Sequence, residues 1–190
     1  MNDNKNSLKI INNVVSGLYS ADGQENKISY PVNKNNRVQW IAIGSDHGGY
    51  EAKESLKVFL RESGYKITDV GTFEKQSVDY PDFAFKVAKK VASGECERGI
   101  MIDGAGIGSS MVCNKVKGIR AALCYDKKTI INSREHNNAN VLTLGGPLHS
   151  LDDLNEMVRI WLDTSFAGGR HWKRINKMMA IEREPHNYKT

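Results

Sequence analysis

Short apolar runs alternate with amphipathic segments along most of the chain from residue 38 onward. The apolar runs predict strands at residues 38–43, 66–71, 99–102, 119–124 and 141–145. Apolar positions spaced by three and four residues predict helices at 49–63, 81–93, 108–117, 127–136, 150–164 and 169–183. Repeated strand–helix units favour an α/β fold, a Rossmann-like three-layer sandwich with a five-stranded parallel sheet. Ligands of such sheets bind outside the carboxyl ends of the strands, so residues directly after the strands are the first candidates for chemistry.

The first 37 residues follow a different pattern, rich in Asn, Lys, Ser and Asp. Their apolar positions step by three, four and three: Leu8, Ile11, Val15 and Leu18. This stripe predicts an amphipathic helix over 7–19, followed by a polar linker over 20–36. We therefore expect an N-terminal extension, 1–37, and a folded domain, 38–190. The helix could pack on its own domain, lie on a membrane surface or dock into a groove of another protein.

Composition and charge exclude several classes of protein. Hydrophobic residues make up 39% of the chain, but no run of about 18 apolar residues predicts a membrane span. The N-terminus lacks the features of a secretory signal, and three cysteines without close pairing suit a reducing compartment, so we expect a cytoplasmic protein. The cysteines and histidines show no zinc spacing. The net charge of +5 is not gathered into basic runs interleaved with aromatics, so we expect no nucleic-acid partner.

Two loops after predicted strands carry candidate chemistry. The first, GSDHGGYEAK, places Asp46 next to His47 between glycines, although an aspartate there could simply cap the next helix. The second, DGAGIGSS, begins at Asp103 and has three glycines whose amides could form an anion-binding nest at a helix N-terminus. The glycine pattern alone is also compatible with a dinucleotide site, but no acidic residue ends a strand about 20 residues later. No phosphate loop of the GxxxxGK[ST] type is present.

Two later segments are the remaining candidates. His136 and Asn137 precede the fifth predicted strand, where asparagines also favour an ordinary turn. Arg170 and Arg174 are four residues apart, so they share a helix face and could clamp a phosphate. A solvated basic face is the commoner explanation for such a pair.

In this order, the segments resemble the ribose-5-phosphate isomerase B family, which includes the galactose-6-phosphate isomerase subunits. The resemblance covers residues 39–183 and rests on IGSDHGGYEAK, DYPDFA, GIMIDGAGIGSSMVCNKVKGIRAALC, SREHNNANVLTLGG and FAGGRHWKRINKM. It implies an aldose–ketose isomerase that works through a cis-enediolate and needs no metal or organic cofactor. It also implies a homodimer or homotetramer whose sites are completed across the subunit interface.

The resemblance also implies roles for individual residues. Asp46 and His47 would contact the sugar, with Tyr80 lining the site. His136 would assist ring opening, and Asn137 would bind near the reacting oxygens. The enediolate would be stabilised by the backbone amides between Gly104 and Ser109, a stretch that includes Ala105, Gly106 and Gly108. Arg170 and Arg174 would hold the phosphate.

The chain departs from the family pattern at four positions. Many relatives have a cysteine base where this chain has Asp103, and another branch has a glutamate where it has Ser109. Ala105 replaces a common Thr or Ser, and Pro147 stands where relatives often carry a phosphate-binding arginine. We predict that the Asp103 carboxylate replaces the thiolate as base. The alternative is that Asp103 caps the following helix or binds a sugar hydroxyl, with isomerisation slow or lost.

Cys113 and Cys124 are poor substitutes for the missing thiolate, because one lies in a predicted helix and the other ends a predicted strand. We expect both to be small buried hydrophobes. Ribose 5-phosphate is the expected substrate. A hexose or deoxysugar phosphate, or a sugar-phosphate-binding protein without catalysis, are the alternatives.

The N-terminal extension resembles the encapsulation peptides of bacterial microcompartment cargo enzymes. That resemblance implies a shell protein as the partner of residues 1–20 and a location inside a microcompartment.

Overall fold

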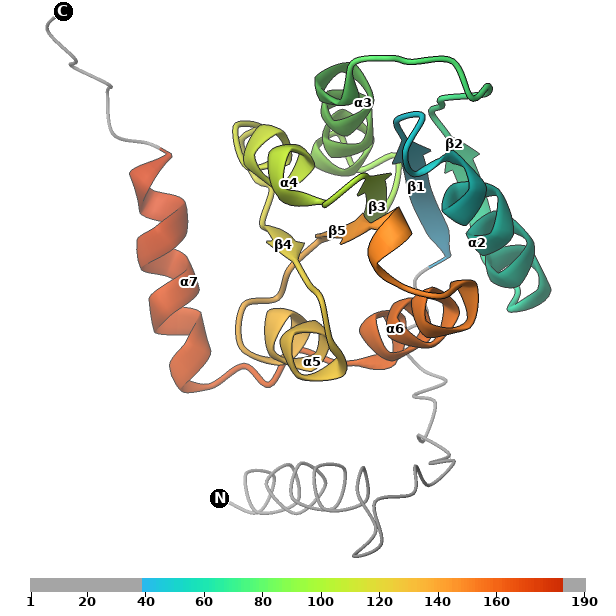
Figure 1. The fold of residues 1–190 in the computed structure, drawn as a ribbon. Coiled ribbons are helices and arrows are strands. Elements are labelled where there is room, and N and C mark those ends of the chain that lie inside the picture. Colours follow the sequence, from blue (N-terminus) through green and yellow to red (C-terminus); the bar gives the residue numbers. More distant parts are fainter. Residues whose placement is uncertain (1–38, 183–190) are drawn as a thin grey trace, which may run out of the picture. The chain divides into compact units, whose positions relative to one another are not determined.

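A five-stranded parallel sheet forms the centre of the protein (Figure 1). The structure is a computed structural model that describes residues 39–182, so the predicted helix over 7–19 and its linker lie outside the described residues. The strands lie side by side in the order β2-β1-β3-β5-β4. Their bounds are β1 Trp40–Ser45, β2 Lys66–Asp69, β3 Arg98–Asp103, β4 Ala121–Leu123 and β5 Val141–Gly145.

Helices cover both faces of the sheet, which gives the three layers predicted from the sequence. One face carries α3 (Tyr80–Ala92) and α4 (Ile107–Cys113), which pack on each other and on the central strands. The other face carries α2 (Tyr50–Glu62), α5 (Lys127–Glu135) and α6 (Leu151–Asp163). The last helix, α7 (Arg170–Ile181), stands outside these layers, beyond the edge strand β4 (Figure 1).

The predicted elements are confirmed, with differences at their ends. The helix expected to reach residue 117 ends at Cys113, because the side chain of Asn114 turns to bond the backbone of Ala121 and starts the connection to β4. The second strand stops at Asp69 instead of residue 71, since Gly71 adopts a positive φ of 101°. A short 3-10 turn, Gly146–Leu148, follows β5 and was not predicted.

A stripe of small residues forms the buried face of α3. The larger Phe85 is exposed, and the ammonium of Lys89 lies over its ring. The buried positions follow the spacing i, i+3, i+4, i+7 and are Ala84, Val87, Ala88 and Val91. Small side chains on this stripe let the helix approach the sheet closely. Phe85 lies beside the stripe, on the exposed side of the helix.

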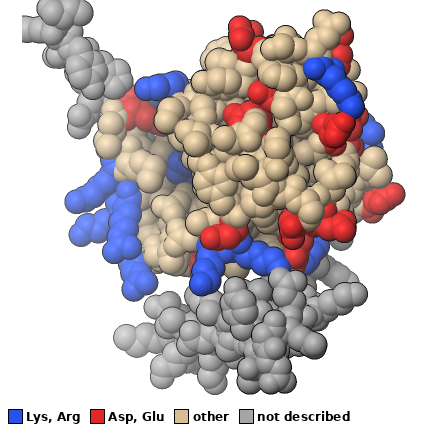
Figure 2. All heavy atoms as spheres, in the orientation of Figure 1, with Lys and Arg blue, Asp and Glu red and all other residues tan. Residues whose placement is uncertain are grey.

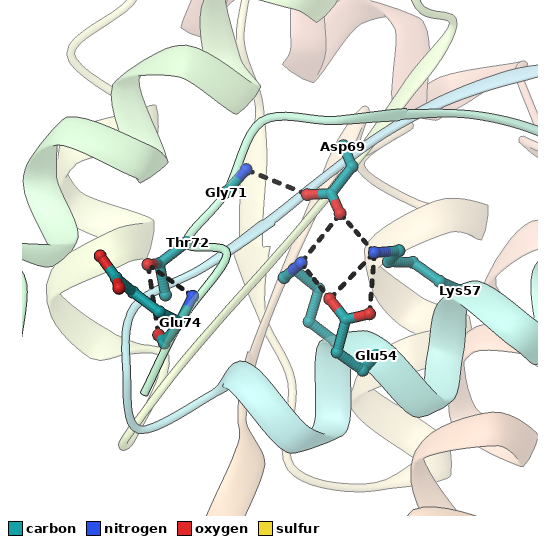
Figure 3. Close-up of polar contacts among 7 residues, drawn as sticks. Glu54, Lys57, Asp69, Gly71, Thr72 and Glu74 are labelled. Carbon is teal, nitrogen blue, oxygen red and sulfur yellow. Dashed lines mark hydrogen bonds and ion pairs between the residues drawn. The ribbon is translucent and has the colours of Figure 1, made fainter. Parts of the chain in front are cut away.

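A fully buried lysine ties α2 to the second strand. The Lys53 side chain is 0% exposed, and its ammonium lies 2.9 Å from Asp69 Oδ2 and 2.5 Å from Glu54 Oε1. Lys57, one turn further along α2, contacts the same two carboxylates, as Figure 3 shows. Two ammonium groups and two carboxylates therefore compensate one another, which is what burial of a charged lysine requires.

This network also supports the end of β1, where the candidate site begins. Asp69 Oδ1 accepts a hydrogen bond from the Gly71 amide (Figure 3). The carbonyl of Gly71 in turn accepts from the Ser45 amide at 2.6 Å. Burial alone would raise the pKa of Asp69, but hydrogen bonds from Lys57 and Lys53 outweigh burial and lower it. The charged form of Asp69 is thus favoured by folding.

We expect Asp69→Asn to lower the free energy of unfolding by about 3 kcal/mol, since it leaves Lys53 short of a charged partner in the interior. Glu54→Gln, at a more exposed carboxylate, is the control and should cost about 1 kcal/mol or less. Urea unfolding at pH 7 measures both. Because the pKa of Asp69 is lowered in the folded protein, its contribution should be lost as the pH falls below the ordinary value of 3.8. Equal losses in the two variants would contradict this assignment.

Candidate active site

Two aspartates follow neighbouring strands at the centre of the sheet. Ser45 at the end of β1 is paired with Ile102 of β3, so Asp46 and Asp103 come next on adjacent strands. The amide of Asp46 donates to the carbonyl of Ile102 at 3.2 Å, which holds the two strand ends together. Since β2 lies on the other side of β1 from β3, this is the point where the strand order reverses. Both aspartates are buried, Asp46 with 8% and Asp103 with 5% exposure.

Two glycines allow the loop after β1 to approach β3. A Cβ atom on Gly49 would lie 2.6 Å from the carbonyl carbon of Ile102 and closer still to its oxygen, so no side chain fits there. A Cβ on Gly48 would meet Asp46 Oδ1 and the Gly104 amide nitrogen at 3.4 Å each, an ordinary contact. Asp46 Oδ1 also accepts from the Gly49 amide at 3.0 Å, so the loop is fixed by its own side chain.

The carboxylate of Asp103 lies inside the glycine loop that follows β3. Its Oδ1 accepts from the amides of Ala105, at 2.8 Å, and Gly106. Its Oδ2 accepts from the amide of Ser109, at 3.3 Å, and from the Ser109 hydroxyl. Gly106 has a φ of +76°, which few side chains tolerate, and this turn aims the amides inward. Three of the predicted amides, those of Ala105, Gly106 and Ser109, therefore donate to Asp103 itself in this structure.

Aromatic side chains flank the glycine loop. The ring of Tyr80 covers Gly108 closely enough that a Cβ there would lie 2.5 Å from it. The hydroxyl of Tyr125 donates to the Ala105 carbonyl at 3.1 Å and so orients that peptide unit. The sequence reasoning missed Tyr125, although its place just after the fourth strand was the available signal. His47, the neighbour of Asp46, accepts from the Val78 amide through Nδ1 at 3.3 Å.

Burial and neighbouring charges change the pKa values of several groups in this region. Burial raises the pKa of Asp46, and the charge of Asp103 adds to that effect, while the hydrogen bond from the Gly49 amide opposes it. The cysteines are unsuited to nucleophilic or base chemistry. Burial raises the pKa of Cys113 to about 12 and that of Cys124 to about 11, which confirms the expectation that both are small buried hydrophobes.

The other predicted site residues form a second group at α7. The ring of His136 stacks on that of His171, with centroids 4.3 Å apart. Arg170 and Arg174 are exposed on α7, and Figure 2 shows Lys and Arg side chains gathered on that side of the molecule. The pKa of His171 is lowered, by burial first and then by His136 and the two arginines. The sequence reasoning did not single out His171, which lies between the arginines. The side chain of Asn137 is turned onto Asn132.

The two groups lie at opposite ends of the strands, one at the carboxyl ends and the other near the amino ends. Helix α5 starts after the carboxyl end of β4 and runs back, so His136 at its end lies near the amino ends of the strands. The carbonyl of Asn140 accepts from the Gly99 amide at the start of β3. Asp103 lies at the other end of β3, four residues or about 13 Å further along. One copy of the chain thus brings Asp46, Tyr80 and Asp103 together but keeps His136 and the arginines apart from them.

A groove separates α7 from the rest of the folded domain. Its volume is about 1060 Å³, and its walls come from β4, α5 and α7, including Ala122, Leu123 and Met178. Only His171 and Ile175 of α7 are buried, while Trp172, Met178 and Ile181 are exposed. The apolar surface of this helix is therefore largely uncovered in a single copy.

Within residues 39–182, no group of three or more His, Cys, Asp and Glu side chains is placed to hold a metal ion. Within the same range, no helix is both long and apolar enough to cross a membrane.

Comparison with known proteins identifies the family. Residues 41–178 match the family model described as Ribose/Galactose Isomerase. Ribose-5-phosphate isomerase B of Escherichia coli is 40% identical over 142 residues, which cover 75% of this chain and 95% of that protein. The chain belongs to the ribose/galactose isomerase family.

Solved structures of ribose-5-phosphate isomerase B agree with this assignment. The Clostridium thermocellum enzyme is 50% identical, with a TM-score of 0.75 over 76% of this chain and 98% of its own. The Mycoplasma genitalium enzyme, solved with bound ribulose-5-phosphate, is 38% identical, with a TM-score of 0.76 over 79% and 100%. The predicted fold class and family are confirmed.

The turn after β5 borders the candidate site. Pro147 lies in the 3-10 turn after β5, where it offers no charge to a phosphate. Its neighbour Leu148 is exposed and packs over Gly145, so close that a Cβ on Gly145 would lie 2.7 Å from it. The same Cβ would lie 3.1 Å from Ala105, so an apolar side chain borders the glycine loop on this side.

The approach of the β1 loop to β3 can be tested with adjacent glycines. We expect Gly49→Ala to lower the free energy of unfolding by about 2 kcal/mol, because its methyl group would overlap the Ile102 carbonyl. Gly48→Ala has room for its methyl group and should stay within about 1 kcal/mol of the wild type. Urea unfolding compares the two. A larger loss for Gly48→Ala would show that the two loops are packed differently.

Proposed function

We propose that the protein is an aldose–ketose isomerase that interconverts ribose 5-phosphate and ribulose 5-phosphate. The observation that carries the proposal is the buried carboxylate of Asp103 at the carboxyl end of β3, in a chain of this family. A relative at 40% identity is named ribose-5-phosphate isomerase B, and the Mycoplasma genitalium structure contains ribulose-5-phosphate. The reaction needs a base beside C1 and C2 and donors for the developing oxyanion.

Asp103 is the proposed base, and its hydrogen bonds indicate which oxygen reacts. Oδ1 is held by two amides, whereas Oδ2 has one longer amide contact and the Ser109 hydroxyl. A hydroxyl rotates about its C–O bond, so Ser109 can turn toward a bound sugar and free a lone pair on Oδ2. The freed Oδ2 would take the proton from C2, and Ser109 would donate to the enediolate oxygen.

The complete site is proposed to contain residues of two copies of the chain. His136, Asn137, Arg170 and Arg174 lie about a strand length from Asp103 in one copy, too far to contact the same pentose. The exposed apolar face of α7 and the groove beside β4 support contact with a second copy. In a two-fold dimer each site would receive a base from one subunit and phosphate-binding arginines from its partner.

Two observations favour alternatives to this substrate and activity. Pro147 offers no charge, and its neighbour Leu148 presents an apolar surface beside the glycine loop, which favours a hexose or deoxysugar phosphate as a second candidate substrate. The four donors on Asp103 also suit a capping role, in which the protein binds a sugar phosphate without turnover. The assay below separates these cases.

We also propose that residues 1–20 dock onto another protein, with a microcompartment shell protein as the partner that the resemblance implies. The support is the amphipathic sequence pattern of residues 7–19.

Conversion of ribose 5-phosphate to ribulose 5-phosphate by the purified full chain, with EDTA present, tests the activity. We expect turnover in EDTA, and a loss of at least about 100-fold in Asp103→Asn with ribose 5-phosphate binding retained, because the amide cannot accept the C2 proton. Asp126→Asn is the control, since Asp126 also follows a strand but only caps α5. Unchanged turnover in Asp103→Asn would refute its role. Turnover of a hexose or deoxysugar phosphate alone would favour the second candidate.

Mixing two inactive variants tests the shared site. Asp103→Asn and Arg174→Ala are each expected to be nearly inactive as pure proteins. After the subunits exchange, about a quarter of wild-type activity should return, because half of the dimers are mixed and each has one intact site of two. Turnover before and after mixing measures this, with size-exclusion chromatography to establish the oligomer. A mixture no more active than its components would show that each site lies within one copy.

A further inference from the structure

The site contains a second carboxylate whose surroundings differ from those of Asp103. Asp46 and Asp103 follow the paired residues Ser45 and Ile102, so they lie at equivalent positions on neighbouring strands, whose separation is about 4.8 Å. Asp103 receives four hydrogen bonds from its own loop, whereas Asp46 receives one, from Gly49. Negative charge is therefore well compensated on one carboxylate and poorly compensated on the other.

We propose that Asp46 is a second catalytic residue, which in the reactive form of the enzyme carries a proton and passes it between O1 and O2 of the substrate. Asp103 moves hydrogen between C1 and C2, and Asp46 moves hydrogen between the two oxygens. This inference rests on the proposed isomerase activity and adds the group that completes its proton transfers.

The surroundings of Asp46 favour its protonated form. It is buried, and the carboxylate of Asp103 on the adjacent strand repels negative charge on it. The opposing groups are the amides of Gly49 and Gly48 and the exposed His47, which lies next to Asp46 in the chain. A bound sugar phosphate adds further negative charge to the site, and a like charge favours the neutral carboxylic acid. Two neighbouring carboxyl groups with different surroundings are typical of sites in which one acts as the acid and the other as the base.

The other side chains near the glycine loop are less suited to this task. Ala105 has no hydroxyl, and the Ser109 hydroxyl can donate a hydrogen bond to the enediolate oxygen but, as an alcohol, is too weak an acid to give up its proton. Asp46 Oδ1 and the Gly104 amide nitrogen lie close to each other beside Gly48, since a Cβ atom there would be 3.4 Å from each. A substrate oxygen that reached both groups would meet a carboxylic acid on one side and a backbone donor on the other.

Both carboxyl groups take part in the proposed proton transfers. Oδ2 of Asp103 takes the proton on C2, and the C–H electron pair forms the C1–C2 double bond. The π pair of the C1 carbonyl moves to O1, which takes the proton of Asp46. Asp46, now a carboxylate, takes the proton of the O2 hydroxyl as the O2 pair forms the C2 carbonyl. The C1–C2 π pair then takes the proton from Asp103 at C1. Both carboxyl groups return to their starting states.

Asp46→Asn tests the inference, because asparagine keeps the oxygen that accepts from Gly49 but cannot release a carboxyl proton. Two rates are measured on ribose 5-phosphate in D₂O: turnover to ribulose 5-phosphate and deuterium uptake at C2 of the remaining aldose. We expect turnover to fall about 100-fold, while deuterium uptake falls less than about ten-fold, since Asp103 still opens the C2–H bond. His47→Gln, at the adjacent site residue, should lower both rates together.

The pH dependence of the wild-type enzyme provides a second readout that does not need the variant to fold. Wild-type kcat should fall at high pH as Asp46 loses its proton; where Asp46→Asn folds, this fall should be absent in it. Parallel loss of turnover and deuterium uptake in Asp46→Asn, uncoupling by His47→Gln instead, or a wild-type profile without the alkaline fall would overturn the role of Asp46. A wild type with neither turnover nor deuterium uptake would overturn the proposed isomerase activity itself.

Discussion

The hydrogen bonds that Asp103 accepts from its own loop set the shape of the candidate site. Three backbone amides and one hydroxyl converge on a single carboxylate, so the loop after β3 closes around a charge supplied by its first residue. Such a loop needs no bound anion to become ordered. In the proposed reaction the amides of Ala105 and Gly106 would keep Oδ1 in place, while Ser109 turns toward the ligand and frees Oδ2.

The direction of the strands and helices limits what one copy of this fold can do. In a parallel sheet each helix returns the chain to the amino ends of the strands. Residues that follow strands therefore lie at the carboxyl ends, and residues that follow helices lie near the amino ends. Asp46 and Asp103 belong to the first kind, whereas His136 and the α7 arginines belong to the second. A site that uses both kinds needs two copies, and the proposed oligomer is thus tied to the chemistry.

The sequence was sufficient for the fold and for the nearness of Asp46 and Asp103. Both follow from hydrophobic periodicity and from the rule that parallel strands end at the same edge. Contacts that depend on side-chain direction could not be predicted from the sequence pattern. Lys53 sits on the core-facing side of α2 because carboxylates from two elements meet it there, and Phe85 is exposed because smaller residues take the buried stripe.

The position of the Asp103 side chain inside the glycine loop could not be predicted from the sequence, for a related reason. Spacing predicted amides pointing at an anion, and it named Asp103 as the residue at the mouth of that loop. It could not show that the anion and Asp103 are the same group, because this depends on one side-chain torsion. Likewise, Tyr125 and His171 act through hydrogen bonding and stacking with residues far away in the sequence.

The burial of all three cysteines affects how the protein reacts with oxidants and alkylating reagents. Cys96, Cys113 and Cys124 are the chain's three cysteines, all are buried, and the pKa of each is raised. Peroxides and alkylating reagents attack thiolates, so none of these three cysteines is a ready target. With a carboxylate at the position where the resemblance implies a thiol in many relatives, the proposed base itself contains no sulfur that could be oxidised or alkylated.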